Sequence, residues 1–273
     1  MFLFILFIFG LFVGSFLNVL IDRLPKGKSI IKGRSYCDKC KKILKWYDLI
    51  PLLSFISLKG RCRYCKAKLS FYYPLVELTT GLMFAITASF VLNSFEFPIS
   101  NFQFLINSQF LNFQLLMSLI YYLFIISSLI VIFFADLKYG IIPDKIVFPA
   151  IFVSAFYLLT MNYQLLTINF LSAVGASLFF LILFLITKGK GMGFGDVKFA
   201  FLMGLILGFP NIVVGLYAAF LTGAIVGCIL ILWQKKRIRG TSIPFGPFLV
   251  IGSLTAIFFG DVLAQSFLRA LLL

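Results

Sequence analysis

Residues 111–134 read LNFQLLMSLIYYLFIISSLIVIFF, a run without an acidic or basic side chain. A helix needs about 20 consecutive apolar residues to cross the hydrocarbon core of a bilayer. This run is long enough, and Ala135 and Asp136 follow it directly. It therefore predicts a membrane-spanning helix that ends close to an acidic side chain.

The composition of the whole chain agrees with that run. Of 273 residues, 62% are hydrophobic and 12% are charged, and the mean hydropathy is +1.08. Soluble domains are roughly half apolar and one quarter charged, so a soluble or disordered chain is excluded. We predict an all-α polytopic membrane protein with about eight spans, the sixth of them short, near residues 1–21, 74–92, 111–134, 142–160, 165–187, 197–208, 211–233 and 246–268.

The positive charges lie in alternate loops. The chain has 24 Lys and Arg against 9 Asp and Glu, a net charge of +15, which in a soluble protein would suggest nucleic acid as a partner. Here the loops that stay in the cytoplasm are expected to be the basic ones. The pattern predicts no nucleic-acid partner, a multi-pass membrane protein with its basic loops in the cytoplasm, and both termini outside the cytoplasm. The first apolar run lacks a basic segment before it, so we expect a retained helix rather than a cleaved secretory signal.

Four of the five cysteines form two CxxC pairs, in the basic loop of residues 22–73. Cys37 pairs with Cys40, and Cys62 with Cys65. Two such pairs fit the spacing of a structural zinc site with four thiolate ligands. Two disulfides, or no bond at all, are the alternatives; a reducing cytoplasmic loop without a core of its own favours zinc. Cys228, in the seventh span, is expected to pack.

Five acidic residues lie at or within predicted spans: Glu77, Asp136, Asp144, Asp196 and Asp261. An ionisable group at membrane depth is costly unless it faces an interior or a water-filled cavity, so each is a functional candidate. We interpret Glu77 and Asp261 as groups near span ends that snorkel or bond a neighbouring helix.

Asp136 and Asp196 are expected to meet. Both lie at the predicted cytoplasmic ends of apolar runs, and a glycine-rich segment ending in Gly193-Phe194-Gly195 precedes Asp196. Two carboxylates brought close together share a proton, so one can activate water while the other acts as an acid. The chain has no His, which excludes the His-dependent hydrolytic sites. A flexible loop is the alternative interpretation of the glycine run.

The chain resembles the bacterial prepilin peptidases, the type IV leader peptidase family of membrane aspartic proteases. The resemblance runs nearly end to end, through Gly14-Ser15-Phe16-Leu17-Asn18-Val19, Arg23-Leu24-Pro25, the paired CxxC loop, Tyr73-Pro74-Leu75-Val76-Glu77-Leu78, Ile142-Pro143-Asp144, Gly193-Phe194-Gly195-Asp196-Val197-Lys198 and Pro244-Phe245-Gly246-Pro247-Phe248. It implies that Asp136 and Asp196 are the catalytic pair. It also implies supporting roles for Asp144, Gly193, Gly195 and Lys198.

The resemblance also implies the reaction. Such an enzyme removes the basic leader of type IV prepilins or type II secretion pseudopilins. It does so at the cytoplasmic face of the lipid bilayer of the bacterial inner membrane. Bifunctional members then methylate the new N-terminus with S-adenosylmethionine. Residues 1–92 would form the methyltransferase-associated region and residues 110–273 the peptidase core. A peptidase without the methyltransferase activity is the alternative, since the residues themselves reveal no methyl-donor site.

Three further features have two interpretations each. Asn18 either bonds a neighbouring helix or contacts substrate, with the helix bond favoured. Lys198 either tunes the aspartate pair or anchors the chain at the interface. The turn at residues 244–248 either lies near the site or only begins a helix. Two other protein classes, a transporter and a membrane anchor, would leave the two aspartates without a hydrolytic role.

Overall fold

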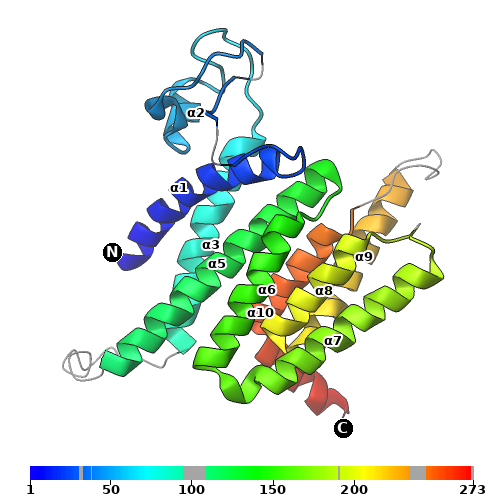
Figure 1. Ribbon diagram of the computed structural model, residues 1–273. Helices are drawn as coiled ribbons and strands as arrows, with labels where there is room; N and C mark the ends of the chain where they lie inside the picture. Colours follow the sequence, from blue (N-terminus) through cyan, green and yellow to red (C-terminus); the bar gives the residue numbers. More distant parts are fainter. Residues whose placement is uncertain (31–32, 38, 95–108, 190, 234–243, 272–273) are drawn as a thin grey trace. The chain divides into compact units, whose positions relative to one another are not determined.

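The computed structural model describes residues 1–30, 33–37, 39–94, 109–189, 191–233 and 244–271. This part of the chain contains no β-strand, only two isolated bridges. The predicted all-α fold is confirmed (Figure 1). Most of the predicted loop at 93–109, Lys190 and the basic loop at 234–240 lie outside the described residues. The elements in chain order are α1 (Phe2–Arg23), η1 (Trp46–Leu49), α2 (Leu53–Ser57), α3 (Tyr72–Ser94), α5 (Gln109–Tyr139), α6 (Asp144–Met161), α7 (Tyr163–Ile186), α8 (Phe194–Leu207), α9 (Asn211–Trp233) and α10 (Gly246–Leu271).

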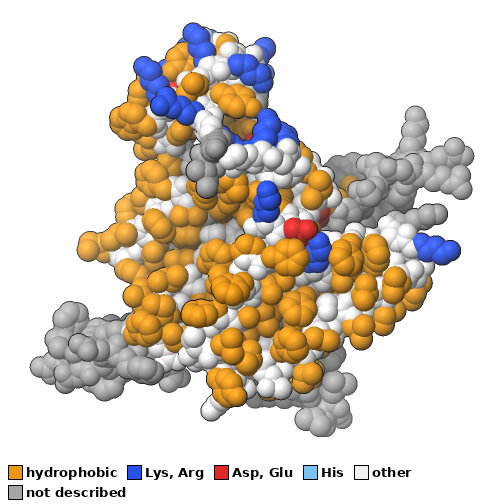
Figure 2. All heavy atoms as spheres, in the orientation of Figure 1, with side chains coloured by type: hydrophobic (Ala, Val, Ile, Leu, Met, Phe, Trp, Pro, Cys, Tyr) orange, Lys and Arg blue, Asp and Glu red, His pale blue; other side chains and the backbone are white. Residues whose placement is uncertain are grey.

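Each of the eight predicted apolar runs forms a helix. Among the described residues, seven helices are long and apolar enough to cross a membrane: α1, α3, α5, α6, α7, α9 and α10. The sixth run forms α8, whose 14 residues extend about 21 Å at 1.5 Å per residue, short of a bilayer's hydrocarbon core. Large hydrophobic side chains are exposed on the long helices, as Figure 2 shows in orange. The chain is a multi-pass membrane protein.

The chain divides into two compact units, Met1–Val131 and Ile132–Leu273. In the first unit, α1 packs along α3 because glycines remove the side chains that would hold the helices apart. A Cβ added at Gly14 would lie 2.7 Å from the Glu77 Cα, and one at Gly10 would lie 2.8 Å from the Gly81 Cα. Such small-residue faces allow membrane helices to approach closely. Asn18 adds a bond between these helices, from its Nδ2 to the Tyr73 carbonyl at 3.1 Å.

The segment between α1 and α3, residues 24–71, forms a small cysteine domain that contains η1 and α2. Lys and Arg side chains gather on it, seen in blue in Figure 2. Arg23, at the end of α1, binds the start of this domain by donating to the carbonyls of Ser29 and Gly33, each at 3.1 Å.

In the second unit, α8 packs against α7, and α9 against α10. A Cβ at Gly204 of α8 would lie 2.5 Å from the Ala173 Cα of α7. Asn169 of α7 donates to the Leu205 carbonyl of α8 at 2.9 Å. Asn211 of α9 donates to Asp261 of α10 at 2.8 Å, which confirms that Asp261 bonds a neighbouring helix. The short α8 is therefore held between longer helices.

Candidate functional site

Asp136 lies in the last turns of α5 and is 5% exposed. Its Oδ2 accepts a hydrogen bond at 2.9 Å from the backbone N–H of Gly246, the first residue of α10. A Cβ on residue 246 would lie 2.5 Å from that same oxygen, so only glycine fits beside the carboxylate. The backbone of α10 therefore fixes the position of the Asp136 side chain.

Asp196 lies in the first turn of α8 and is 6% exposed. Its Oδ2 accepts a hydrogen bond at 3.1 Å from the backbone N–H of Gly193, which precedes the helix. The amino end of a helix favours a negative charge, because its first N–H groups have no partner within the helix. The glycine segment thus holds Asp196 as a cap of α8.

The structure brings these two carboxylates into one electrostatic environment. The Asp136 carboxylate is near enough to Asp196 for a Coulombic interaction, although 60 residues separate them in the sequence. The backbone bonds engage Oδ2 of each residue. Among the described residues no hydrogen bond reaches the Oδ1 of either aspartate, so each Oδ1 can bind a proton or a water molecule.

Asp144 and Lys198 form an ion pair beside this site. The Lys198 ammonium lies 2.8 Å from both carboxylate oxygens of Asp144, which connects the start of α6 to α8. The same ammonium lies over the rings of Phe148 and Phe194, at 5.5 and 5.2 Å from their centroids. The carboxylate that Lys198 binds is thus that of Asp144. The two interpretations of Lys198 from the sequence, tuning the aspartate pair and anchoring the chain at the interface, both stay predictions.

The two glycines of the site have different structural roles. Gly193 supplies the N–H that binds Asp196. Gly195 allows the segment before α6 to approach, since a Cβ there would lie 3.0 Å from the Ile142 Cβ. Gly246, considered from the sequence only as part of the turn at residues 244–248, has both roles for Asp136. The only signal for it was the Pro-Phe-Gly-Pro turn, which the structure locates next to Asp136.

The four cysteines of the two CxxC pairs form a second candidate site. Their sulfur atoms all lie within 4.8 Å of one another, and all four are free thiols. Tetrahedral zinc with 2.3 Å bonds would separate its sulfur ligands by about 3.8 Å, close to the 3.9 Å between Cys37 and Cys65. The cluster could therefore hold a metal ion. Cys228 is exposed on α9, so the expectation that it packs was wrong.

The two CxxC segments fold alike. The Cys37 N–H donates to the Lys42 carbonyl at 3.0 Å, and the Cys62 N–H donates to the Ala67 carbonyl at 2.8 Å. Backbone N–H groups, chiefly that of Cys65, lower the pKa of the Cys62 thiol to about 7. The N–H of Ala67 lowers the pKa of Cys65, but desolvation and the neighbouring thiols outweigh it and raise that pKa to about 11. A bound cation would offset the repulsion between the negative charges, so that all four thiols could lose their protons together.

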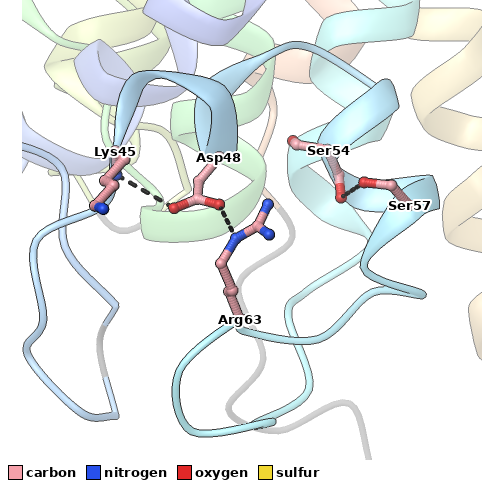
Figure 3. A network of polar contacts seen from close by, with 5 residues as sticks. All are labelled: Lys45, Asp48, Ser54, Ser57 and Arg63. Atoms are coloured by element: carbon pink, nitrogen blue, oxygen red, sulfur yellow. Dashed lines mark hydrogen bonds and ion pairs between the residues drawn. The ribbon is translucent and has the colours of Figure 1, made fainter.

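A polar network holds the second CxxC segment against η1 (Figure 3). Asp48 accepts hydrogen bonds from the Arg63 guanidinium at 2.6 Å and from the Lys45 N–H at 3.2 Å. The Asp48 side chain is only 3% exposed, so this ion pair is partly shielded from solvent. Arg63 stands between Cys62 and Cys65, and the contact therefore fixes the position of that pair of thiols.

Two family models match the chain. The Bacterial Peptidase A24 N-terminal domain matches residues 8–91, and the Type IV leader peptidase family matches residues 123–228. A protein of Bacillus subtilis named prepilin leader peptidase/N-methyltransferase is 31% identical over 266 residues, 97% of both chains. A relative of the same name from Legionella pneumophila is 32% identical over 281 residues, 93% of this chain and 90% of its own.

This chain belongs to the type IV leader peptidase family. A relative from Pseudomonas aeruginosa extends the comparison, with 29% identity over 291 residues, 95% of this chain and 91% of its own. No solved structure matches the chain. The first family model includes most of α1, the cysteine domain and most of α3; the second includes both Asp136 and Asp196.

Proposed function

We propose that this chain is a prepilin leader peptidase in which Asp136 and Asp196 cleave the leader of type IV prepilins or type II secretion pseudopilins. One observation carries the proposal. Two carboxylates from different helices are each more than nine-tenths buried, each is fixed by one backbone N–H, and they interact electrostatically. The names of the family's members, prepilin leader peptidase/N-methyltransferase, support the choice of substrate.

The pair would act as an acid and a base. The ionised carboxylate takes a proton from water, whose oxygen adds to the carbonyl carbon of the scissile bond. The protonated carboxyl donates a hydrogen bond to the carbonyl oxygen and then gives its proton to the leaving amine as the C–N bond breaks. The Gly193 and Gly246 N–H groups keep both carboxylates in place. Asp144, Lys198 and Gly195 support the helix starts around them.

A second activity, N-methylation of the new terminus, is part of the proposal. The relatives' names include N-methyltransferase, and they align over the N-terminal region as well as the core. Residues 1–92 would serve methylation and residues 110–273 proteolysis. S-adenosylmethionine would supply the methyl group. Zinc, bound by Cys37, Cys40, Cys62 and Cys65, would stabilise the cysteine domain and take no part in either reaction, because four thiolates leave no open position.

We place the protein in the inner membrane, with both termini outside the cytoplasm and the aspartates near the cytoplasmic face. The support is the charge pattern, since residues 22–73 and 188–198 are rich in Lys and Arg. By the same charge rule, the basic leader of a precursor would stay on the cytoplasmic side, where the aspartates could reach it. Cysteine labelling from either side of the membrane tests this orientation.

Cleavage by the purified protein tests the proposed dyad. A prepilin-type precursor is incubated with wild type, Asp136→Asn, Asp196→Asn and, as a matched control, Asp261→Asn. The amide oxygen that this control introduces can still accept the bond from Asn211, so the control should cut at the wild-type rate. Both dyad variants should lose about 100- to 10,000-fold in kcat, because each lacks a proton-transfer group. A dyad variant that still cuts normally removes that residue from the mechanism, and a folded wild type that cuts no precursor favours the membrane anchor.

A further inference from the structure

The first unit contains a cavity of about 520 Å³ between the α1–α3 pair and the cysteine domain. Sites for small organic molecules have volumes of roughly 300–1,000 Å³. Asp136 and Asp196 belong to the second unit and do not line this cavity. It has the size of a cofactor site and no assigned ligand.

One face of α1 forms a wall of the cavity. It contributes Ser15, Asn18, Val19 and Asp22, which recur at the spacing that brings helical residues to a single face. Glu77, from the second turn of α3, continues this wall. The wall is thus polar and acidic, although it lies at the end of two apolar helices.

Asn18 leaves a hydrogen-bond acceptor unused in that wall. The residue is 6% exposed, and its Nδ2 donates to the Tyr73 carbonyl, which confirms the bond between helices expected from the sequence. Its Oδ1 is buried and has no partner. Buried polar atoms nearly always have a hydrogen-bond partner. A buried acceptor without one at a cavity wall therefore points to a ligand that donates a hydrogen bond.

The cavity has charges of both signs and apolar surface. Glu77 is 8% exposed and accepts the Leu52 N–H at 2.9 Å with its Oε2, and Asp22 accepts the Tyr73 hydroxyl at 3.0 Å. Five positive residues also line the cavity, and the aromatic ring of Phe55 adds apolar surface; the positive residues are Arg23, Lys26, Lys28, Arg34 and Arg63. A ligand with a cationic centre, a carboxylate and a flat ring would match all three kinds of surface.

We propose that this cavity binds S-adenosylmethionine, with Glu77 and Asn18 as its polar anchors. The inference rests on the proposed N-methyltransferase function. In methyl transfer the neutral substrate amine forms a bond to the methyl carbon, the C–S bond breaks, and both its electrons stay on the sulfur. The sulfonium charge thereby moves to the nitrogen as a secondary ammonium. A carboxylate such as Glu77 favours the cationic donor over its neutral-sulfur product, S-adenosylhomocysteine, and so aids product release.

Calorimetric titration of the full-length protein in nanodiscs tests the site, with S-adenosylmethionine and S-adenosylhomocysteine as separate ligands. Val19→Trp fills the cavity from α1, and Phe16→Trp puts the same indole on a face of α1 where Phe16 is 53% exposed. Glu77→Gln removes the charge and can still accept the Leu52 N–H. Leader cleavage by each preparation reports whether the protein is folded.

We expect Val19→Trp to weaken binding of both ligands at least tenfold and Phe16→Trp to change neither. Glu77→Gln should weaken S-adenosylmethionine about tenfold and S-adenosylhomocysteine by less. Unchanged binding in a folded Val19→Trp protein would refute the cavity, even if the wild type methylates its product. Equal losses of both ligands in Glu77→Gln would refute the charge role of Glu77. A wild type that cleaves but neither binds nor methylates would instead refute the methyltransferase half of the proposed function.

Discussion

Replacing Gly246 with alanine should impair cleavage although the change adds one methyl group. The Cβ would lie 2.5 Å from the Asp136 Oδ2 and 3.0 Å from its Cγ, whereas ordinary contact begins near 3.4 Å. The carboxylate must therefore move by about 0.9 Å, or α10 must retreat by as much. Either movement breaks the 2.9 Å bond from the Gly246 N–H.

The size of the effect follows from that bond. A hydrogen bond to a charged group is worth about 1.5–3 kcal/mol, and each 1.36 kcal/mol of barrier changes a rate tenfold. Gly246→Ala should therefore lower kcat by about 10- to 100-fold. KM should change little, because the contact of residue 246 is with the proposed catalytic side chain of Asp136.

The assay is steady-state cleavage of a prepilin-type precursor by the purified protein, with thermal unfolding measured on the same samples. Gly227→Ala on α9 is the matched control, since a Cβ there meets nothing within 4 Å. A folded Gly246→Ala protein with wild-type kcat would refute the argument that the α10 backbone positions Asp136 for catalysis.

Three other changes give separate tests. Gly14→Leu should lower the melting temperature and disturb the first unit, because the new side chain would collide with the backbone of α3 at Glu77. Gly175→Leu on α7 is the control and should leave the melting temperature unchanged, since nothing lies within 4 Å of a Cβ there. Equal melting temperatures of the two variants would contradict the close packing. Cys62→Ser should reduce the bound metal, measured by mass spectrometry, from about one ion per chain to far less. Cys228→Ser should leave the metal content unchanged. Full metal content in the Cys62→Ser protein would rule out the four-thiolate site. Asp144→Asn and Lys198→Met should each reduce the rate of cleavage less than about fivefold, because partly exposed ion pairs contribute about 0–1 kcal/mol. The double variant should lose no more activity than either single variant. Additive losses would show that the two residues act independently.

Several local features could be predicted from the sequence because short stretches determine them. The apolar run of residues 111–134 predicted a membrane helix, since each backbone polar group in lipid must bond within its own segment. The CxxC spacing predicted that Cys37, Cys40, Cys62 and Cys65 would gather, and they do. The cost of an ionisable group in a membrane singled out five acidic residues, with Asp136 and Asp196 among them.

The tertiary structure decided what depends on contacts between distant segments. Gly246 follows Asp136 by 110 residues, and nothing in the local sequence says that its N–H meets the carboxylate. The Asp144–Lys198 ion pair and the orphan oxygen of Asn18 are likewise set by helix packing. Hydropathy and spacing act along the chain, and they indicate which residues enter the membrane or could bind a metal. Hydrogen bonds and close approaches act across space, and they fix how each carboxylate is held and where a cavity remains.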